Sequence, residues 1–277
     1  MPDQFSLGVA AAAQKIRDKA LSPVSLAESL LDRIDSLDPA LKAWVTIDRE
    51  EVISTARELE KELDEKGPRG PLHGVPVGLK DIFYTEGMLT AAGSRIYSDF
   101  VPKYDAATVT KIKEAGGIIL GKAVTTEFAL FDPPPTINPW NKAHTPGGSS
   151  TGSSVAVATR MCAAALGTQT AGSTCRPAAY NGIVGLKPTY GRVSKYGVIP
   201  LAWSLDTVGI LARSTEDTAL LLQAMAGHDP GDPASSTEPV PDYLGGLERL
   251  ERPPHIGLVR DFFYERAQEG VRAHTDA

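Results

Sequence analysis

Residues 145–188 read TPGGSSTGSSVAVATRMCAAALGTQTAGSTCRPAAYNGIVGLKP, and this stretch organises the rest of the chain. Its Gly, Ser and Thr residues come in clusters, a composition that also suits a flexible linker. Apolar runs at 155–158 and 163–166 interrupt the clusters, and such runs are typical of buried segments. The pattern therefore predicts a packed core with two serine-bearing loops, 147–150 and 167–173.

The loop at 167–173 has the layout of a nucleophile site. An expected strand at 163–166 runs into a turn of small residues, Ser173 follows, and 178–180 is expected to continue as a short helix. Backbone N–H groups of such a turn can converge on one anion, as an oxyanion hole requires. The candidate oxyanion residues are Thr170, Ala171, Gly172 and Ser173.

A serine is a poor nucleophile without a base. No histidine lies inside the stretch, although His144 adjoins it and His73 lies upstream. A neutral lysine can serve instead, because burial readily lowers the pKa of lysine. Lys80 is the candidate, since it ends an alternating apolar run at 75–79 that predicts a short strand. Taken alone, the pattern is explained better by a Lys80 that points to solvent or pairs with Asp81, because lysine is rarely fully buried unless paired.

Three motifs follow one another along the chain. They are HGVPVGLKD at 73–81, PGGSSTGSS at 146–154, and GTQTAGS with the following RPA and GIVGLKPTYGRVS at 167–194. In this order they resemble the amidase signature family of serine amidohydrolases, and the likeness runs over 72–211. The resemblance implies an α/β fold with a mixed open sheet covered by helices on both faces, and it makes 72–211 the catalytic signature core.

The resemblance also implies a Ser–Ser–Lys triad. Ser173 matches the nucleophile that forms the acyl-enzyme, Ser149 matches a bridging serine that follows a cis peptide bond, and Lys80 matches the general base. We expect Phe128 and Gly148 to contact the substrate, although an isolated aromatic residue such as Phe128 is more often part of the core.

The chain departs from the family pattern around the nucleophile. The family often has GTDTGGS in this turn, whereas this chain has Gln169 and Ala171. Cys175 stands where the family commonly has an arginine, two residues after the nucleophile, and Arg176 comes one residue later. These changes bear on substrate preference more than on the reaction.

Composition argues against several classes of protein. The chain has 277 residues and a formal net charge of −6, which gives no basis for nucleic-acid binding. Two cysteines make no disulfide framework and favour a reduced, cytoplasmic setting. No Cys/His spacing indicates a metal site, and no apolar run has the length of a membrane span. We expect a small-molecule amide or ester substrate, no cofactor, no membrane contact, and a homodimer as one candidate assembly.

The whole of 1–277 is expected to form a single amidase-type domain, C-terminally shortened or a fragment, with a helical N-terminal part at 1–66. Local signals define its expected elements. We expect one helix from Ser22-Pro23 to Asp38-Pro39 and another from Asp48 to Gly67. We also expect helix caps at Asp105 and Ser214 and a strand at 255–259.

Four interpretations of the chemistry remain open at this point. The first is an amidohydrolase that uses the Ser–Ser–Lys triad, and GTQTAGS with 125–128 favours it. The second is the glutaminase (A) subunit of a tRNA-dependent amidotransferase, which needs partner subunits. The third is an inactive fragment or a phosphate-binding protein, although no GxGxxG occurs. The fourth is a Ser/His/Asp triad with His73 or His144, which only geometry can identify.

Overall fold

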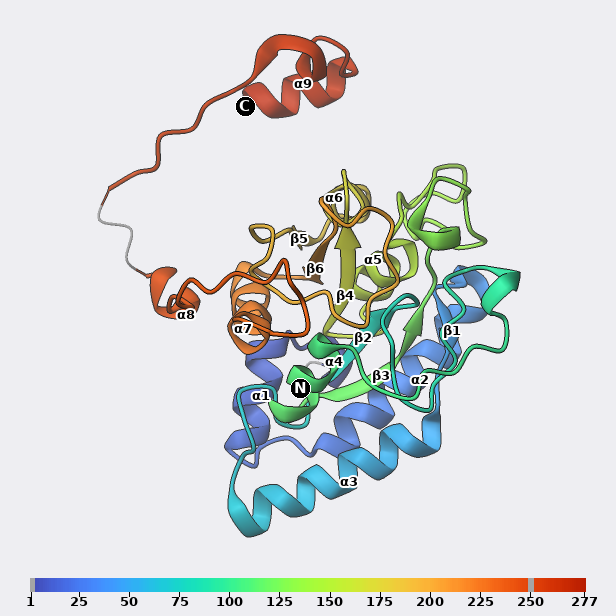
Figure 1. Cartoon of the computed structure of the whole chain (residues 1–277), viewed down its shortest axis with the longest axis vertical. Helices are drawn as coiled ribbons and strands as arrows, with labels where there is room; N and C mark the ends of the chain where they lie inside the picture. Colours follow the sequence, from blue (N-terminus) through green and yellow to red (C-terminus); the bar gives the residue numbers. More distant parts are fainter. Residues whose placement is uncertain (1–2, 249–251) are drawn as a thin grey trace. The chain divides into compact units, whose positions relative to one another are not determined.

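The computed structural model describes residues 3–248 and 252–277 and contains a six-stranded sheet (Figure 1). The strand order is β1-β3-β2-β4-β6-β5. The strands are β1 (Trp44–Thr46), β2 (Pro76–Lys80), β3 (Ile118–Ala123), β4 (Ala164–Gln169), β5 (Val184–Leu186) and β6 (Thr207–Ala212). Because β2 is parallel to both β3 and β4 while the outer pairings are antiparallel, the sheet is mixed, as predicted.

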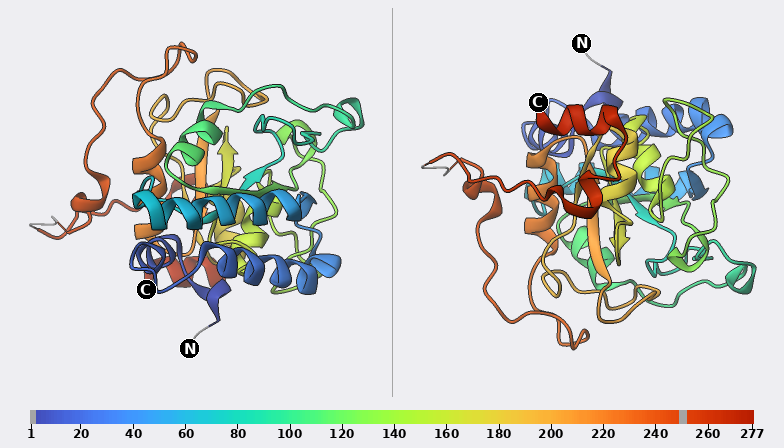
Figure 2. Two further views of the ribbon diagram at one scale, coloured as in Figure 1. Left: turned by 90° about the horizontal axis from the view of Figure 1, so that it is seen from below. Right: turned by 90° about the horizontal axis from the view of Figure 1, so that it is seen from above.

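Helices cover both faces of this sheet. One hydrophobic cluster joins the strands to α1, α4 and α7, and a second joins them to α2, α3 and α5. Figure 2 shows α2 and α3 lying side by side. The helices are α1 (Val9–Arg17), α2 (Pro23–Leu41), α3 (Arg49–Lys66), α4 (Ala107–Glu114), α5 (Thr151–Ala158), α6 (Cys175–Asn181), α7 (Thr215–Met225), α8 (Tyr243–Gly246) and α9 (Glu269–Asp276). The predicted open sheet with helices on both faces is therefore confirmed.

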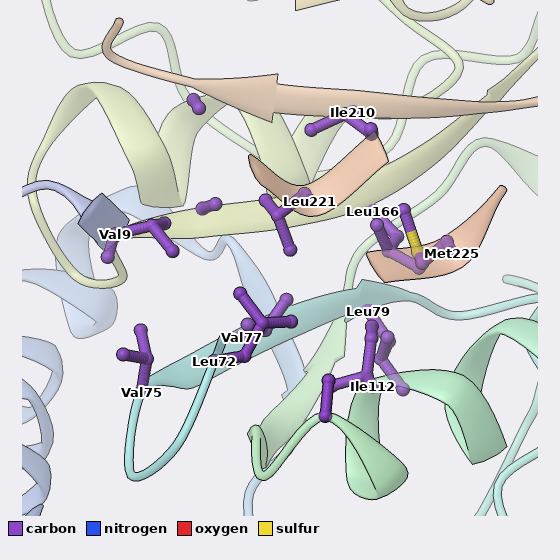
Figure 3. Packing of buried hydrophobic residues seen from close by; sticks show 14 of the residues in the cluster. Val9, Leu72, Val75, Val77, Leu79, Ile112, Leu166, Ile210, Leu221 and Met225 are labelled. Atoms are coloured by element: carbon purple, nitrogen blue, oxygen red, sulfur yellow. The ribbon is translucent and has the colours of Figure 1, made fainter. Parts of the chain in front are cut away.

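Successive side chains of β2 point to opposite faces of the sheet. Val77 and Leu79 enter the first cluster, where Figure 3 shows them near Ile112 and Leu221. Burying each such apolar side chain stabilises the fold by roughly 1.5–3 kcal/mol. The side chain of Lys80 belongs to the other set, on the side of the sheet where α5 begins. The packing of β2 thus aims one lysine at the start of α5.

Three predicted helix caps are confirmed. The side chain of Ser22 accepts a hydrogen bond from the backbone of the first turn of α2, with Pro23 as the first helical residue. Asp48 and Ser214 do the same for α3 and α7. Each cap satisfies an N–H group that the helix itself leaves unpaired, and a cap of this kind contributes about 1 kcal/mol.

Two predicted boundaries are wrong. The second helix does not stop at Asp38-Pro39 but continues through Pro39 to Leu41, and Lys42 ends it in a left-handed conformation with φ 55°. Proline has no N–H group for the carbonyl four residues earlier, so α2 loses one backbone hydrogen bond at Pro39 and continues for only two more residues. Asp105 does not cap α4, because its carboxylate instead accepts from the Glu86 amide and pairs with Lys113.

The expected strand at 255–259 is also wrong. These residues have no regular structure, and Ile256 and Val259 are exposed. A strand needs a neighbour for its backbone groups, and within the described residues this segment pairs with none. The chain divides into two compact units, Met1–Leu244, which contains the sheet and both clusters, and Gly245–Ala277, which contains α9. The assignment of 1–277 to one amidase-type domain, with its parts 1–66 and 72–211, stays a prediction.

Candidate active site

Lys80 ends β2 and is fully buried. Its Nζ donates hydrogen bonds to Ser149 Oγ at 2.7 Å and to Thr168 Oγ1 at 2.9 Å. Burial disfavours the charged ammonium and lowers the pKa of Lys80 to about 7, while the negative charge of Asp206 opposes this shift. The side chain therefore does not point to solvent, and near neutral pH a large share of it is an unprotonated amine.

Asp81, the neighbour that could have paired with Lys80, pairs instead with Lys122. The two groups are 3.4 Å apart and both are fully buried. Lys122 Nζ also donates to the Phe83 carbonyl at 2.7 Å and to Thr90 Oγ1 at 2.6 Å. The sequence reasoning missed this pair, although Lys122 lies next to the last residue of an apolar strand and Lys80 is the last residue of another. Because Asp81 pairs with Lys122, it is not the ion-pair partner of Lys80.

The first serine loop passes directly beside the lysine. The Gly148–Ser149 peptide bond is cis, which confirms the expectation drawn from the resemblance. Ser149 is fully buried, and its carbonyl accepts from the Thr126 amide at 3.3 Å. Arg176 donates from Nε at 3.1 Å and from Nη2 at 2.6 Å to the Gly148 carbonyl. The displaced arginine of this chain thus fixes the loop that carries Ser149.

The two serine loops are tied to each other. The Ser150 amide donates to the Ser173 carbonyl at 3.2 Å, and the Thr168 amide donates to Ser150 Oγ at 3.2 Å. Gly167 makes this approach possible, because a Cβ added there would lie 2.5 Å from Ser150 Oγ. The structure therefore brings the loop of Ser173 against the loop of Ser149.

Ser173 lies between the end of β4 and the start of α6 and is 9% exposed. Gln169 Oε1 accepts from the amides of Thr174 and Cys175, each at 2.9 Å. A neutral glutamine thus caps α6 where the family often has an aspartate. This contact fixes the chain immediately after Ser173.

The turn from Thr170 to Ser173 needs no left-handed residue, since none of its residues has a positive φ. Ala171 is exposed, so its methyl group has room. The substitution of alanine for the family's glycine is therefore compatible with the turn. The role of these residues as oxyanion donors stays a prediction.

The histidines do not assemble a competing triad. His73 Nδ1 accepts from the Arg69 amide at 2.9 Å, and Nε2 bonds to the Leu59 carbonyl at 2.9 Å. With both ring nitrogens engaged, His73 is a structural residue. His144 lies on an exposed loop. Lysine is thus the base candidate that the geometry favours.

Phe128 is partly buried and packs edge-on against Tyr97, with ring centroids 5.6 Å apart. Its backbone is left-handed, with φ 45°. Substrate contact by Phe128 and Gly148 stays a prediction. Within residues 3–248 and 252–277 there is no group of three or more metal-ligating side chains, and no helix there has the length and apolarity to cross a membrane.

Comparison with known proteins places this geometry in context. The curated relatives include a protein of Geobacter sp. (strain M21) that is named as one subunit of glutamyl-tRNA(Gln) amidotransferase and is 45% identical over 278 residues. That alignment covers 98% of this chain and 57% of the relative. The same subunit of Carboxydothermus hydrogenoformans is 43% identical over 95% of this chain and 56% of its own length. The chain thus spans little more than half the length of these relatives.

Solved structures of amidases also resemble this chain in fold. The native peptide amidase from Stenotrophomonas maltophilia has a TM-score of 0.82 and 39% identity, over 87% of this chain and 53% of its own. The structure of fatty acid amide hydrolase has a TM-score of 0.79 and 25% identity, over 87% of this chain and 46% of its own. The family description Amidase matches residues 25–277. The chain therefore belongs to the amidase signature family.

Proposed function

We propose that this chain cleaves carboxylic amides, with Ser173 as nucleophile, Ser149 as proton relay and Lys80 as general base. The observation that carries the proposal is the contact of 2.7 Å between a fully buried Lys80 Nζ and Ser149 Oγ. A lysine without a carboxylate partner, with its pKa lowered to about 7, is suited to accept a proton at neutral pH.

The proposed reaction has two halves. Neutral Lys80 takes the hydroxyl proton of Ser149 while Ser149 takes that of Ser173, and Ser173 Oγ bonds to the amide carbon. Amides of the turn at 170–173 stabilise the oxyanion, and each such donor is worth roughly 3–4 kcal/mol in comparable sites. The C–N bond then breaks as the proton returns to the leaving nitrogen. Water next attacks the acyl-enzyme by the same relay, which releases the acid and restores Ser173.

For the substrate, the curated relatives favour the second interpretation of the sequence over the first. At 41–45% identity, they are named as a subunit of glutamyl-tRNA(Gln) amidotransferase. We therefore propose the glutamine side-chain amide as the leading substrate, with ammonia as the product that partner subunits receive. In this role the chain is cytoplasmic and binds no nucleic acid itself, in keeping with its net charge of −6.

A free-standing amidase is the second candidate. The structural likeness to a peptide amidase at 39% identity supports it, and so does the departure of Gln169 and Ala171 from the common turn. In this role the substrate is a small amide or ester, and a homodimer replaces the partner subunits. Both candidates use the same three side chains, so they differ in the substrate that carries the amide and in the partner subunits, not in the reaction.

Ammonia release tests the proposal. The chain is incubated with glutamine, or with a peptide that ends in a carboxamide, each with and without amidotransferase partner subunits. Ser173→Ala is expected to abolish release, whereas Ser235→Ala, a serine with the same 9% exposure, is expected to preserve it. Release from glutamine only with the partners supports the first candidate, and release from the peptide without them supports the second. No release under any condition contradicts the proposal and favours an inactive fragment.

A further inference from the structure

The point where β4 leaves the sheet faces the start of β6. The two strands pair in antiparallel register from Ala164↔Ala212 to Gln169↔Thr207. One step further, the same register places Thr170 opposite Asp206. Directly opposed side chains on an antiparallel pair lie close enough to interact. Thr170 is also the first residue of the turn that leads to Ser173, so this cross-strand pair sits at the entrance of the turn.

The carboxylate of Asp206 is almost fully enclosed by donors. Thr170 Oγ1 donates a hydrogen bond to Oδ1, and the amides of Leu201 and Ala202 donate to Oδ2 at 2.7 and 2.8 Å. The residue is only 9% exposed. Three donors on two oxygens hold this carboxylate in one place beside the start of β6.

We propose that Asp206 is a positioning residue for the amide cleavage proposed above. Its hydrogen bond with Thr170, here called the latch, holds Thr170 beside the start of β6 and thereby fixes the entrance of the turn at 170–173, here called the oxyanion turn. The inference rests on that proposed function. It assigns to Asp206 no contact with the substrate, only the placement of the turn and a charge near Lys80.

The latch matters because side chains hold the turn at both of its ends. Gln169 fixes the far end through the amides of Thr174 and Cys175, and Asp206 fixes the near end through Thr170. Between them Ala171 is exposed. An oxyanion hole works only when its donors are held in place before the reaction, and a displacement of about 1 Å can slow a reaction roughly a hundredfold. Loss of the latch should therefore slow the chemical step more than it weakens binding.

The charge of Asp206 has a separate effect, on Lys80. It raises the pKa of Lys80 against the lowering by burial. The other charged groups in the neighbourhood are engaged elsewhere: Asp81 and Lys122 pair with each other, and Lys195, which lines a small pocket with Asp206, donates to the Trp203 carbonyl. Removing the charge of Asp206 should therefore lower the pKa of Lys80 further and move the acid limb of the rate profile to lower pH.

Four variants of the full chain separate these effects. Thr170→Val removes the latch and leaves the charge, Thr170→Ser retains the hydroxyl, and Asp206→Asn removes the charge. Thr207→Val is the matched control, since the hydroxyl of this buried neighbour donates to the nearby Leu205 carbonyl and not to Asp206. The readouts are the rate at which a fluorophosphonate labels Ser173, and kcat and KM for amide cleavage against pH, with folding checked by circular dichroism.

Thr170→Val should lower the labelling rate and kcat roughly tenfold to a hundredfold, with KM and the acid limb unchanged. Thr170→Ser retains the hydroxyl and should recover most of the rate that Thr170→Val loses, whereas Thr207→Val should stay near the parent. Asp206→Asn should show a similar loss and an acid limb at lower pH. A Thr170→Val that is folded and labels at the parental rate, or a Thr207→Val that loses as much, overturns the latch. A parent that is not labelled at Ser173 contradicts the proposed function itself.

Discussion

Lys80 owes its chemistry to where β2 ends. The side chain is fully buried, its two hydrogen-bond partners are neutral hydroxyl groups, and the nearest carboxylate in sequence, Asp81, is paired with Lys122. Because the Lys80 side chain is removed from water and contacts no anion, its neutral amine form is favoured. A surface lysine with the same neighbours in sequence would remain protonated at neutral pH and could not serve as a base.

Substitution of Lys80 by arginine separates a base from a mere positive charge. Arginine stays protonated at any usable pH and cannot accept a proton. Lys80→Arg and Lys80→Ala should therefore both lower kcat/KM by roughly 10²–10⁴, the usual contribution of a general base. In the parent, kcat/KM should rise with pH through about 7, because the neutral form of Lys80 is the active one. A folded Lys80→Arg with near-parental amide cleavage would exclude Lys80 as the base.

The same burial makes stability depend on pH. The pKa of Lys80 is about 7 in the folded chain, against an ordinary value of 10.5. Between these values the unfolded chain binds more protons, so this group makes the free energy of unfolding increase with pH, by up to roughly 1.4 kcal/mol per pH unit. Lys80→Met should remove that contribution. Urea unfolding at pH 7, 8 and 9 measures it, and an equal slope for parent and variant would contradict the lowered pKa.

At the scale of elements, three of the four predicted caps were right, whereas the long-range pairings were not foreseen. The caps at Ser22 and Asp48 are confirmed because a cap depends on residues within one turn. The expected strand at 255–259 is wrong because an apolar run becomes a strand only with a partner. Lys122 was missed for a similar reason: its contact with Asp81 arises from the pairing of β2 with β3, which no local pattern reveals.

The candidate site was predictable only through its motifs. Their order brought Lys80, Ser149 and Ser173 together as candidates, and the structure places Lys80 Nζ 2.7 Å from Ser149 Oγ. The contacts that hold these loops were not foreseen, because Thr168 and Asp206 act through side chains that meet across different strands. Spacing along the chain does not carry such information.

Gly167 provides a test at the scale of the two serine loops. A Cβ at this position would lie 2.5 Å from Ser150 Oγ, inside a buried strand. Gly167→Ala should therefore lower the free energy of unfolding by roughly 1–3 kcal/mol, as overpacking does, and should also slow labelling of Ser173. Gly246→Ala, where a Cβ would meet no atom within 4 Å, is the control. Equal stability of the two variants in chemical denaturation would argue against a close approach of the loops.

At the scale of the whole molecule, the sheet and both hydrophobic clusters belong to one compact unit, Met1–Leu244. That unit contains Lys80, Ser149 and Ser173. The residues from Gly245 onward form a second unit, in which Ile256, Val259 and Phe263 are exposed. The strands and clusters that position the candidate site therefore all belong to the first unit.

A chain that ends at Leu244 should consequently keep its cooperative unfolding. We expect its Tm to lie within about 3 °C of the parent, since a change of 1 kcal/mol shifts Tm by only about 2–4 °C for a unit of this size. A chain that ends at Ala212 lacks α7, whose Leu221 and Met225 are fully buried, and should fail to fold. Differential scanning calorimetry compares the three chains. Loss of the transition on removal of 245–277 alone would contradict this division of the core.

Covalent trapping tests the central claim most directly, namely that Lys80 and Ser149 activate Ser173. A fluorophosphonate is added to the parent chain and to Lys80→Arg at pH 8, and the modified residue is identified by peptide mass spectrometry. The account predicts a single label on Ser173 in the parent and a rate lower by at least roughly a hundredfold in folded Lys80→Arg. A label on Ser149 or another serine with Ser173 unmodified, or equal labelling rates in the two chains, would contradict it.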